Sequence, residues 1–327
     1  MGHKRGARGN VGLHAGVPGL IPSRAVSTTV TSAPAAPSRT FSANDVAILC
    51  VVVVWGTNYT VVKEALGTIP PLAFMAVRFA IASVAMAALL LVVEGWKPLS
   101  RPVFLKLAAL GLVGNTLYQL CFILGLANTT AANSGLLTAV TPVLVAALGA
   151  ALGVERPSRP LVMGMSLAVV GMVLVVAARG PSLGTGTRLG DGLILGACAC
   201  WALYTVGIRS VGNEVSALRI TAITMLTGAP GVVLAGVPEV LALDVGSIGF
   251  GAWAGVVYSA LVPLVLSYFI WGRTVQQVGS ARASLYNTGV PVVAALTAWG
   301  VRGERPTWLQ ALGAALILGG VLLSRRK

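Results

Sequence analysis

The chain has 327 residues, of which 56% are hydrophobic and only 10% are charged, and its mean hydropathy is +0.87. Soluble globular domains carry about 25% charged residues, so this chain has too few polar side chains to cover a surface that faces water. The composition therefore excludes an ordinary soluble domain. The formal net charge of +14 would indicate nucleic-acid binding only if the basic residues formed a patch on a folded domain.

Residues 1–43 differ from the rest of the chain. They are rich in Gly, Ser, Thr, Pro and Ala, and they contain basic residues but no acidic residue and no long apolar run. This composition predicts a disordered basic tail in the cytoplasm. An Arg- and Ser-rich start without acids also fits an organelle transit peptide. A third interpretation is an upstream start codon that adds residues without a function.

Ten apolar runs follow the tail, each ended by Pro, Gly or a charged residue. About 20 mostly apolar residues are needed to cross about 30 Å of hydrocarbon as a helix, and the runs have about this length. They cover residues 45–66, 71–93, 103–126, 131–152, 160–178, 190–210, 217–237, 248–270, 281–301 and 307–324. We therefore predict an all-α integral membrane protein with ten transmembrane helices.

The basic residues indicate how the chain is oriented. Most of them fall in the tail, in the loops after the second, fourth, sixth and eighth runs, or at the C-terminus. Cytoplasmic loops of membrane proteins carry an excess of Lys and Arg. We therefore predict a multi-pass protein of the cytoplasmic membrane with both termini in the cytoplasm. The predicted partner is thus the lipid bilayer. Orientation in the membrane explains the excess of basic residues, and we expect no nucleic-acid partner.

The second half of the chain repeats the first. A shift of 149 residues aligns residues 131–175 with 280–324 without a gap, and Glu-Arg-Pro recurs 13 residues after Pro142 and Pro291. Five spans per half is an odd number, so the second copy must enter the membrane upside down. Inverted repeats of this kind are typical of secondary transporters. The predicted domains are the tail, a first repeat at 44–178 and a second repeat at 190–324.

These features resemble the EamA-type branch of the drug/metabolite transporter superfamily. The residues that carry the resemblance are Trp55-Gly56-Thr57-Asn58, Lys63, Pro71, Arg78, Pro142, Gly153-Val154-Glu155-Arg156-Pro157, Gly164, Pro291, Arg302-Gly303-Glu304-Arg305-Pro306 and Gly313. The family commonly has Gly-Glu where the first copy has Gly-Val-Glu. The resemblance implies two inverted five-helix repeats around a central cavity, working as a metabolite or amino-acid exporter. It does not name a substrate.

Polar and aromatic side chains inside the spans are candidates for solute binding, because polar groups within a bilayer are costly. Two sets of three share one helix face through i, i+3, i+4 spacing: Trp55, Asn58 and Tyr59, and Asn115, Tyr118 and Gln119. The other candidates are Thr138, Trp201, Tyr204, Tyr258, Tyr286 and Asn287, with Asn133, Ser259 and Tyr268 as further polar groups in the same spans. Any of the Asn residues could instead only bond a neighbouring helix, and a Tyr or Trp near a span end could be an interface anchor.

Arg78 has two interpretations. It lies seven residues beyond Pro71, about 10 Å along a helix. Its guanidinium could bind an anionic group of the solute, such as a carboxylate, or brace the bundle by pairing with Glu64 or backbone oxygens. All nine acidic residues fall at or near span ends. This disfavours a buried proton-coupling carboxylate and favours a neutral, zwitterionic or anionic small-molecule solute.

The sequence therefore predicts a secondary transporter that exports a small organic metabolite, an amino acid or related solute, by alternating access. The two halves would bend at the hinge residues Pro142 and Pro291. Two alternatives are an intramembrane lipid-modifying enzyme and a non-transporting membrane scaffold. We expect no catalytic residues, no cofactor and no metal site, since the spans contain no His and no CxxC pair. The almost wholly apolar fifth and tenth spans would face lipid or a second copy of the chain in a homodimer.

Overall fold

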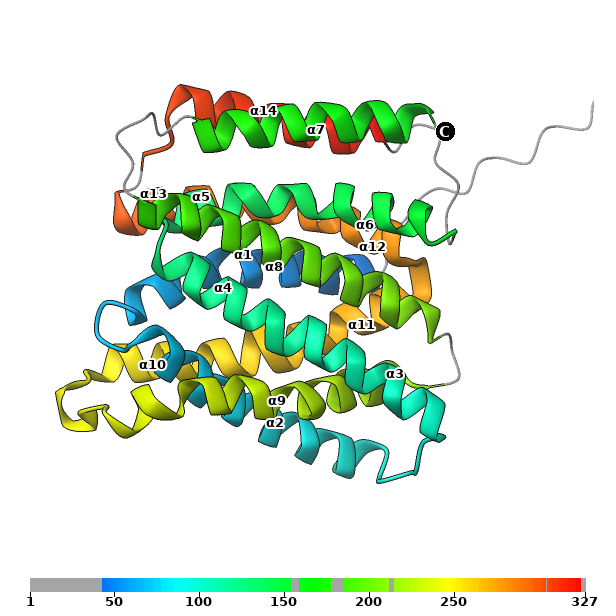
Figure 1. Ribbon diagram of the computed structural model, residues 1–327, viewed down its shortest axis with the longest axis vertical. Helices are drawn as coiled ribbons and strands as arrows, with labels where there is room; N and C mark the ends of the chain where they lie inside the picture. Colours follow the sequence, from blue (N-terminus) through cyan, green and yellow to red (C-terminus); the bar gives the residue numbers. More distant parts are fainter. Residues whose placement is uncertain (1–42, 154–158, 178–184, 212–214, 304, 325–327) are drawn as a thin grey trace, which may run out of the picture. The chain divides into compact units, whose positions relative to one another are not determined.

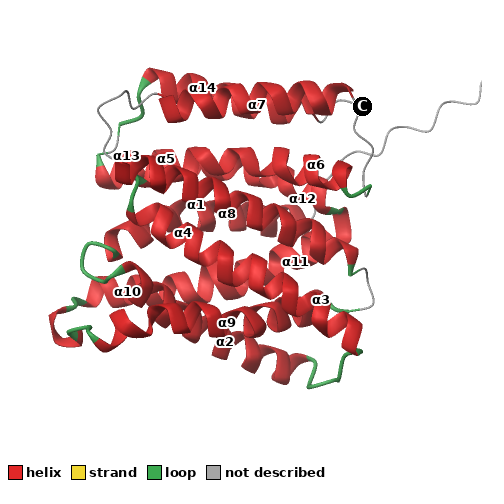
Figure 2. Ribbon diagram, viewed as in Figure 1, coloured by secondary structure: helices red, strands yellow, loops and turns green. Residues whose placement is uncertain are grey.

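The computed structural model describes residues 43–153, 159–177, 185–211, 215–303 and 305–324. The tail predicted at residues 1–43 therefore lies outside the described residues except for its last position. Glu155-Arg156-Pro157 and Glu304, which belong to the repeated Glu-Arg-Pro sequence, also lie outside them. All regular elements of the described ranges are helical (Figure 2).

The helices coincide closely with the predicted apolar runs. In chain order the elements are α1 (Ala43–Ala65), α2 (Pro71–Val93), α3 (Arg101–Gly111), η1 (Leu112–Leu117), α4 (Tyr118–Ala127), α5 (Ala131–Leu137), η2 (Thr138–Val140), α6 (Thr141–Ala151), α7 (Arg159–Ala177), α8 (Thr185–Ser210), α9 (Ala217–Leu241), η3 (Val245–Ser247), α10 (Phe250–Ser259), η4 (Ala260–Leu266), α11 (Ser267–Val278), α12 (Ser280–Tyr286), η5 (Asn287–Gly289), α13 (Val290–Arg302) and α14 (Trp308–Ser324).

Seven helical segments in the described part of the chain are long and apolar enough to cross a membrane. They match seven of the ten predicted spans. The other three predicted spans contain shorter apolar helices, at Val162–Gly171, Val290–Arg302 and Trp308–Gly320. The protein is thus an all-helical, multi-pass membrane protein, while the count of ten spans stays a prediction.

Four of the segments contain an irregular turn. η1 and η4 are π-helical and join α3 to α4 and α10 to α11, whereas η2 and η5 are 3-10 turns that precede α6 and α13. Pro142 and Pro291 lie in the first turn of α6 and α13. Because Pro has no N–H to donate, it is tolerated at the start of a helix and interrupts one elsewhere. The two predicted hinge residues therefore lie directly after local breaks in their helices.

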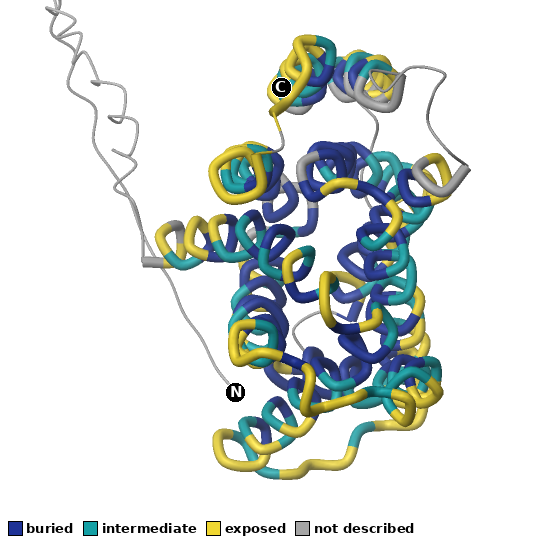
Figure 3. Tube along the Cα trace, turned by 90° about the vertical axis from the view of Figure 1, so that its left-hand side faces the viewer, coloured by how far each residue is buried: buried dark blue, intermediate teal, exposed yellow. Residues whose placement is uncertain are grey.

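The helices between residues 43 and 324 pack side by side (Figure 1). The most extensive pairings are α2 with α9, α7 with α14, α1 with α13, and α4 with α8. Buried residues lie mainly where helices face one another and exposed residues mainly on the outer sides (Figure 3). Many of the outward side chains are apolar, including Val84, Leu91 and Leu234. An exposed apolar surface of this kind suits contact with lipid.

Small residues allow the closest helix crossings. A Cβ atom added to Gly228 of α9 would lie 2.5 Å from the carbonyl oxygen of Gly111, and one added to Gly171 of α7 would lie 2.5 Å from the carbonyl oxygen of Gly313. Glycine at these positions lets the backbones approach each other, as is common between membrane helices.

Candidate functional site

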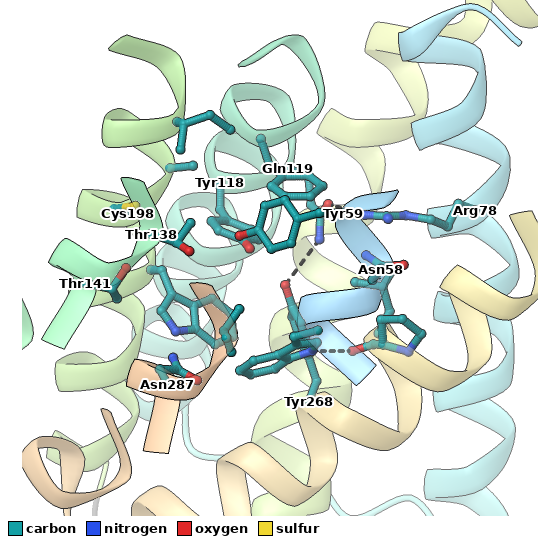
Figure 4. A pocket seen from close by; sticks show the side chains of 18 residues that line it. Asn58, Tyr59, Arg78, Tyr118, Gln119, Thr138, Thr141, Cys198, Tyr268 and Asn287 are labelled. Carbon is teal, nitrogen blue, oxygen red and sulfur yellow. Dashed lines mark hydrogen bonds between the residues drawn. The ribbon is translucent and has the colours of Figure 1, made fainter. Parts of the chain in front are cut away.

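A cavity of about 70 Å³ lies between the helices of the two predicted halves (Figure 4). Its walls come from α1, α2, α4, α6, α8, α11 and α13 and from three of the four irregular turns. The lining residues are Trp55, Asn58, Tyr59, Arg78, Tyr118, Gln119, Phe122, Thr138, Thr141, Ile194, Ala197, Cys198, Trp201, Pro263, Leu264, Tyr268, Asn287 and Val290. Nine of the predicted candidates are therefore brought together at one place.

The three side chains of the first candidate helix face lie together in the cavity lining. Trp55, Asn58 and Tyr59 of α1 all belong to the lining. In the third span only Tyr118 and Gln119 do, because the π-helical turn η1 ends between Asn115 and Tyr118. A π-helical turn contains more residues than a turn of α-helix. The i, i+3, i+4 spacing therefore does not keep Asn115 on the same helix face as Tyr118 and Gln119.

Four predicted candidates lie outside the lining. The Asn115 amide donates to the carbonyl oxygen of Thr224 at 2.9 Å, and the Tyr204 hydroxyl lies 3.3 Å from the hydroxyl of the same residue. The hydroxyl of Tyr258 lies 3.5 Å from that of Thr57, and Tyr286 is half-buried on α12. The first three side chains therefore make helix–helix contacts.

Of the further polar groups, Tyr268 lines the cavity, whereas Asn133 and Ser259 do not. The Asn133 amide donates to the carboxylate of Asp191 at 2.5 Å, and the hydroxyl of Ser259 donates to the carbonyl oxygen of Val256 within its own helix. The Asn133 bond joins α5 to α8, whereas the Ser259 bond stays within α10.

Arg78 is 1% exposed and is held at the edge of the cavity by a chain of polar contacts. Its Nη2 donates to Oε1 of Gln119 at 2.6 Å, and Nε2 of Gln119 donates to the hydroxyl of Tyr268 at 3.2 Å. The guanidinium carbon lies 5.5 Å from the centre of the Phe74 ring and 6.0 Å from that of Phe122. Arginine is suited to such stacking.

Two nitrogen atoms of Arg78, Nε and Nη1, have no hydrogen-bond partner among the residues that the structure describes. Glu64 forms its ion pair with Arg302 instead, so Glu64 does not brace Arg78. The lining contains one positively charged side chain and no carboxylate. The positive charge of Arg78 is therefore not balanced by a carboxylate among the lining residues.

Aromatic rings form much of the remaining wall. The ring centres of Trp55 and Trp201 lie 5.4 Å apart in an edge-to-face arrangement, and the Trp201 centre lies 5.1 Å from that of Tyr268. Nε1 of Trp55 donates to the carbonyl oxygen of Pro263 in the π-helical turn η4 at 3.2 Å. The turn thereby helps to position the ring that links α1 to the second half.

Sequence reasoning did not include several lining residues, among them Phe122, Thr141, Cys198 and Pro263. The spacing contained a signal for two of them. Phe122 follows Gln119 by three residues, and Cys198 precedes Trp201 by three, which places each on the face of a polar or aromatic candidate. No group of three His, Cys, Asp or Glu residues able to hold a metal occurs in the described ranges.

The chain is similar to known transporters along most of its length. The model of the EamA-like transporter family matches residues 43–177 and 188–326. The uncharacterized transporter YyaM of Bacillus subtilis is 28% identical over 272 residues, which cover 82% of this chain and 88% of the relative. A probable terminal-alkyne amino-acid exporter of Streptantibioticus cattleyicolor is 26% identical over 283 residues, which cover 86% of this chain and 93% of the relative.

A solved crystal structure, 21% identical in sequence, superimposes with a TM-score of 0.65 and covers 87% of this chain and 99% of its own. This likeness concerns the fold alone. The family match spans both predicted halves, and the relatives are named transporters. The chain is therefore a membrane transporter rather than an enzyme, and it belongs to the EamA-like transporter family.

Proposed function

We propose that the chain is a secondary transporter that exports a small amino-acid-type metabolite across the cytoplasmic membrane by alternating access. The central cavity carries this proposal, because helices of both predicted halves contribute its polar and aromatic lining. The name of the Streptantibioticus relative as an amino-acid exporter supports the solute class. The sequence predicts no catalytic group, and this prediction is consistent with transport.

We further propose ten spans arranged as two inverted repeats, at 44–178 and 190–324. The irregular turns support this arrangement, because η2 and η5 begin at Thr138 and Asn287, which correspond under the 149-residue shift. The π-helical turns η1 and η4 lie in the third and eighth predicted spans, which are also counterparts. The matching breaks indicate that the two halves share one backbone pattern.

Two matched contacts close opposite ends of the bundle. Nζ of Lys63, near the end of α1, donates to the carbonyl oxygens of Leu126 and Ala127 at the end of α4. Nη1 of Arg209, near the end of α8, donates to the carbonyl oxygen of Gln276 near the end of α11. A shift of 146 residues, which pairs Trp55 with Trp201, also pairs Lys63 with Arg209. Ala127 and Gln276 are 149 residues apart, the spacing that relates residues 131–175 to 280–324.

A second matched pair joins α2 to α9. The Glu94 carboxylate, just after α2, accepts from the Ser216 hydroxyl at the start of α9 and lies 3.5 Å from Nη2 of Arg219. The Glu239 carboxylate, near the end of α9, accepts from the N–H groups of Leu72 and Ala73 in the first turn of α2. A carboxylate is stabilised at a helix N-terminus. Each helix thus holds the beginning of the other.

The contacts described in the two preceding paragraphs are all formed at the same time. The cavity of about 70 Å³ is smaller than the volume of roughly 300 Å³ at which small-molecule pockets usually begin. A metabolite therefore needs the helices to separate at one end. Alternate release of the contacts at the two ends of the bundle would open the cavity to one side and then to the other. Bending directly before Pro142 and Pro291 would permit this motion.

Orientation and assembly are part of the same proposal. The distribution of basic residues supports a cytoplasmic location for both termini. The apolar fifth and tenth spans correspond to α7 and α14, which pack against each other within the chain. A homodimer formed through these two helices stays a prediction.

Flux measurements with purified protein in liposomes test the proposed function. Liposomes loaded with a mixture of the standard L-amino acids should take up a labelled amino acid by exchange. Asn58→Leu and Tyr118→Ala should each lower this flux at least about tenfold. Each variant removes a polar group from the lining, and loss of a hydrogen bond between a binding site and its substrate lowers the rate by this factor or more.

Asn128→Leu is the matched control for Asn58→Leu, because Asn128 is exposed and its amide bonds only within its own helix. It should leave the flux unchanged. Folded wild-type protein that carries none of the labelled amino acids would contradict the transport proposal and favour a scaffold. Unchanged flux in both cavity variants would contradict the assignment of the cavity.

A further inference from the structure

We propose that Arg78 anchors the carboxylate of the transported solute, and that the solute is a zwitterion whose ammonium group is accepted by buried amide oxygens of the same cavity. The inference rests on the proposed transport function and specifies the solute chemistry. Its starting point is that Arg78 lines the cavity while it is almost completely buried.

The charge of Arg78 lacks an anionic partner within the described residues. A buried charge is costly unless it is paired and hydrogen-bonded, yet the side chain has one hydrogen bond, from Nη2 to the amide of Gln119. Nε and Nη1 have no partner among the described groups. An incoming carboxylate would supply both the charge and the acceptors that these two nitrogens need.

Four acidic side chains that lie in or next to α1, α2, α8 and α9 are engaged elsewhere. Glu64 pairs with Arg302, Glu94 with Arg219, and Glu239 with the first turn of α2. The Asp191 carboxylate accepts from the side chains of two residues, Thr129 and Asn133. None of these four carboxylates lines the cavity, so none competes with a solute for Arg78 there.

The guanidinium is fixed in place, while its Nε and Nη1 atoms stay buried without a hydrogen-bond partner among the described residues. Phe74 and Phe122 lie against it, and Gln119, which is tied to Tyr268, holds one nitrogen. Figure 4 shows Arg78 extending toward Gln119. A donor group that is already oriented loses little conformational entropy when it binds a ligand.

Two acceptors for an ammonium group line the same cavity. Oδ1 of Asn58 and Oδ1 of Asn287 are buried and have no hydrogen-bond partner among the described residues. Asn58 belongs to α1 and Asn287 to η5, on the side of the cavity formed by the second predicted half. Because these two oxygen atoms and the two nitrogen atoms of Arg78 are buried, the separation of the helices proposed above would uncover donors for a negative group and acceptors for a positive one. They would lie beside aromatic rings that suit an apolar side chain.

Competition with matched analogues tests this assignment. For an amino acid that the wild-type protein exchanges, the unlabelled acid and its carboxamide are compared as inhibitors of labelled flux in liposomes. The carboxamide keeps the shape and the amino group but lacks the negative charge. The acid should inhibit at a concentration at least about tenfold lower, because a site built to bond one group rejects an analogue without it.

Two variants separate an anchor from a structural brace. Arg78→Gln should abolish the preference for the acid over the carboxamide. Gln119→Glu should fold even where Arg78→Gln does not, because its carboxylate can pair with Arg78, and it should abolish the preference by occupying the guanidinium. Arg101→Gln, at the exposed start of α3, is the control and should keep the preference.

Equal inhibition by acid and carboxamide in a wild-type protein that carries flux would overturn the anchor and leave the transport proposal intact. Retention of the preference in Gln119→Glu, or in a folded Arg78→Gln protein, would overturn it as well. A wild-type protein without amino-acid flux would overturn the transport proposal itself, and the anchor with it.

Discussion

Single residues decide which side chains reach the cavity and how closely the helices approach one another. Asn58 and Asn115 are both amides inside spans, and each belongs to a set of three side chains with i, i+3, i+4 spacing. Asn58 lines the cavity, whereas Asn115 is 0% exposed and bonds a carbonyl oxygen of α9. Spacing along one helix cannot separate these outcomes, because they depend on which helix lies opposite.

Gly228 shows the same dependence on a neighbour. A Cβ atom at this position would lie 2.5 Å from the carbonyl oxygen of Gly111 and 2.6 Å from Cβ of Asn115. We therefore expect Gly228→Ala to lower the free energy of unfolding by about 2 kcal/mol, since overpacking a close contact costs about 1–3 kcal/mol. Thermal unfolding of detergent-solubilised protein should show a lower midpoint.

Gly251→Ala makes the same substitution in the first turn of α10, where an added Cβ atom would have no atom within 4 Å. It should not lower the midpoint, because alanine is the better helix former. A similar midpoint for the two variants would show that the crossing of α9 with α3 tolerates a methyl group.

At the scale of elements, the irregular turns set the positions of the cavity residues. Thr138 and Asn287 begin the two 3-10 turns, and Pro263 lies in a π-helical turn. All three line the cavity. The proline positions could be seen in the sequence, but the π-helical turn η1 contains no proline, so no sequence signal predicted it.

Pro142 and Pro291 allow a test of bending at these turns. Pro142→Ala and Pro291→Ala should each restore a backbone N–H and stiffen the junction with the preceding 3-10 turn. We expect amino-acid exchange to slow by roughly fivefold in each, which corresponds to about 1 kcal/mol. Initial rates in liposomes at equal amounts of incorporated protein provide the measurement.

Pro102→Ala is the control for both hinge variants. Pro102 also lies in the first turn of a helix, α3, but that helix follows a loop rather than a 3-10 turn. Its replacement should leave the rate unchanged. Wild-type rates in both Pro142→Ala and Pro291→Ala would eliminate the hinge mechanism.

For the molecule as a whole, the matched contacts at the two ends provide an internal comparison. Lys63 holds the end of α4 at one end, and Arg209 holds a carbonyl oxygen near the end of α11 at the other. If the ends open alternately, releasing one contact should favour opening at that end only. Cys198 can report this opening, because it is 2% exposed and lines the cavity.

In protein whose other three cysteines are replaced by Ala, Lys63→Gln and Arg209→Gln should raise labelling of Cys198 by a membrane-impermeant maleimide from opposite faces. The increase should be up to about tenfold, since a hydrogen bond to a charged group contributes about 1.5 kcal/mol or more. Vesicles of the two orientations separate the faces. Arg159→Gln, an exposed position of α7, should label as the parent protein does.

Increased labelling from the same face in both variants would contradict alternate opening of the two ends. No increase in either variant would show that these contacts do not hold the ends closed. The experiment also tests the predicted orientation, because the basic-residue distribution places the Arg209 end in the cytoplasm.

The sequence by itself determined the helical membrane class, the helix positions and the transporter family, because apolar length, charge distribution and repeated residues are properties of the chain. It also predicted that Trp55, Asn58 and Tyr59 share one face of α1, and in the structure all three line the cavity. Only the tertiary structure decided that Asn115, Tyr204 and Tyr258 bond other helices and that Arg78 pairs with Gln119 rather than Glu64. These contacts join residues far apart in sequence, so the packing of the helices determines them.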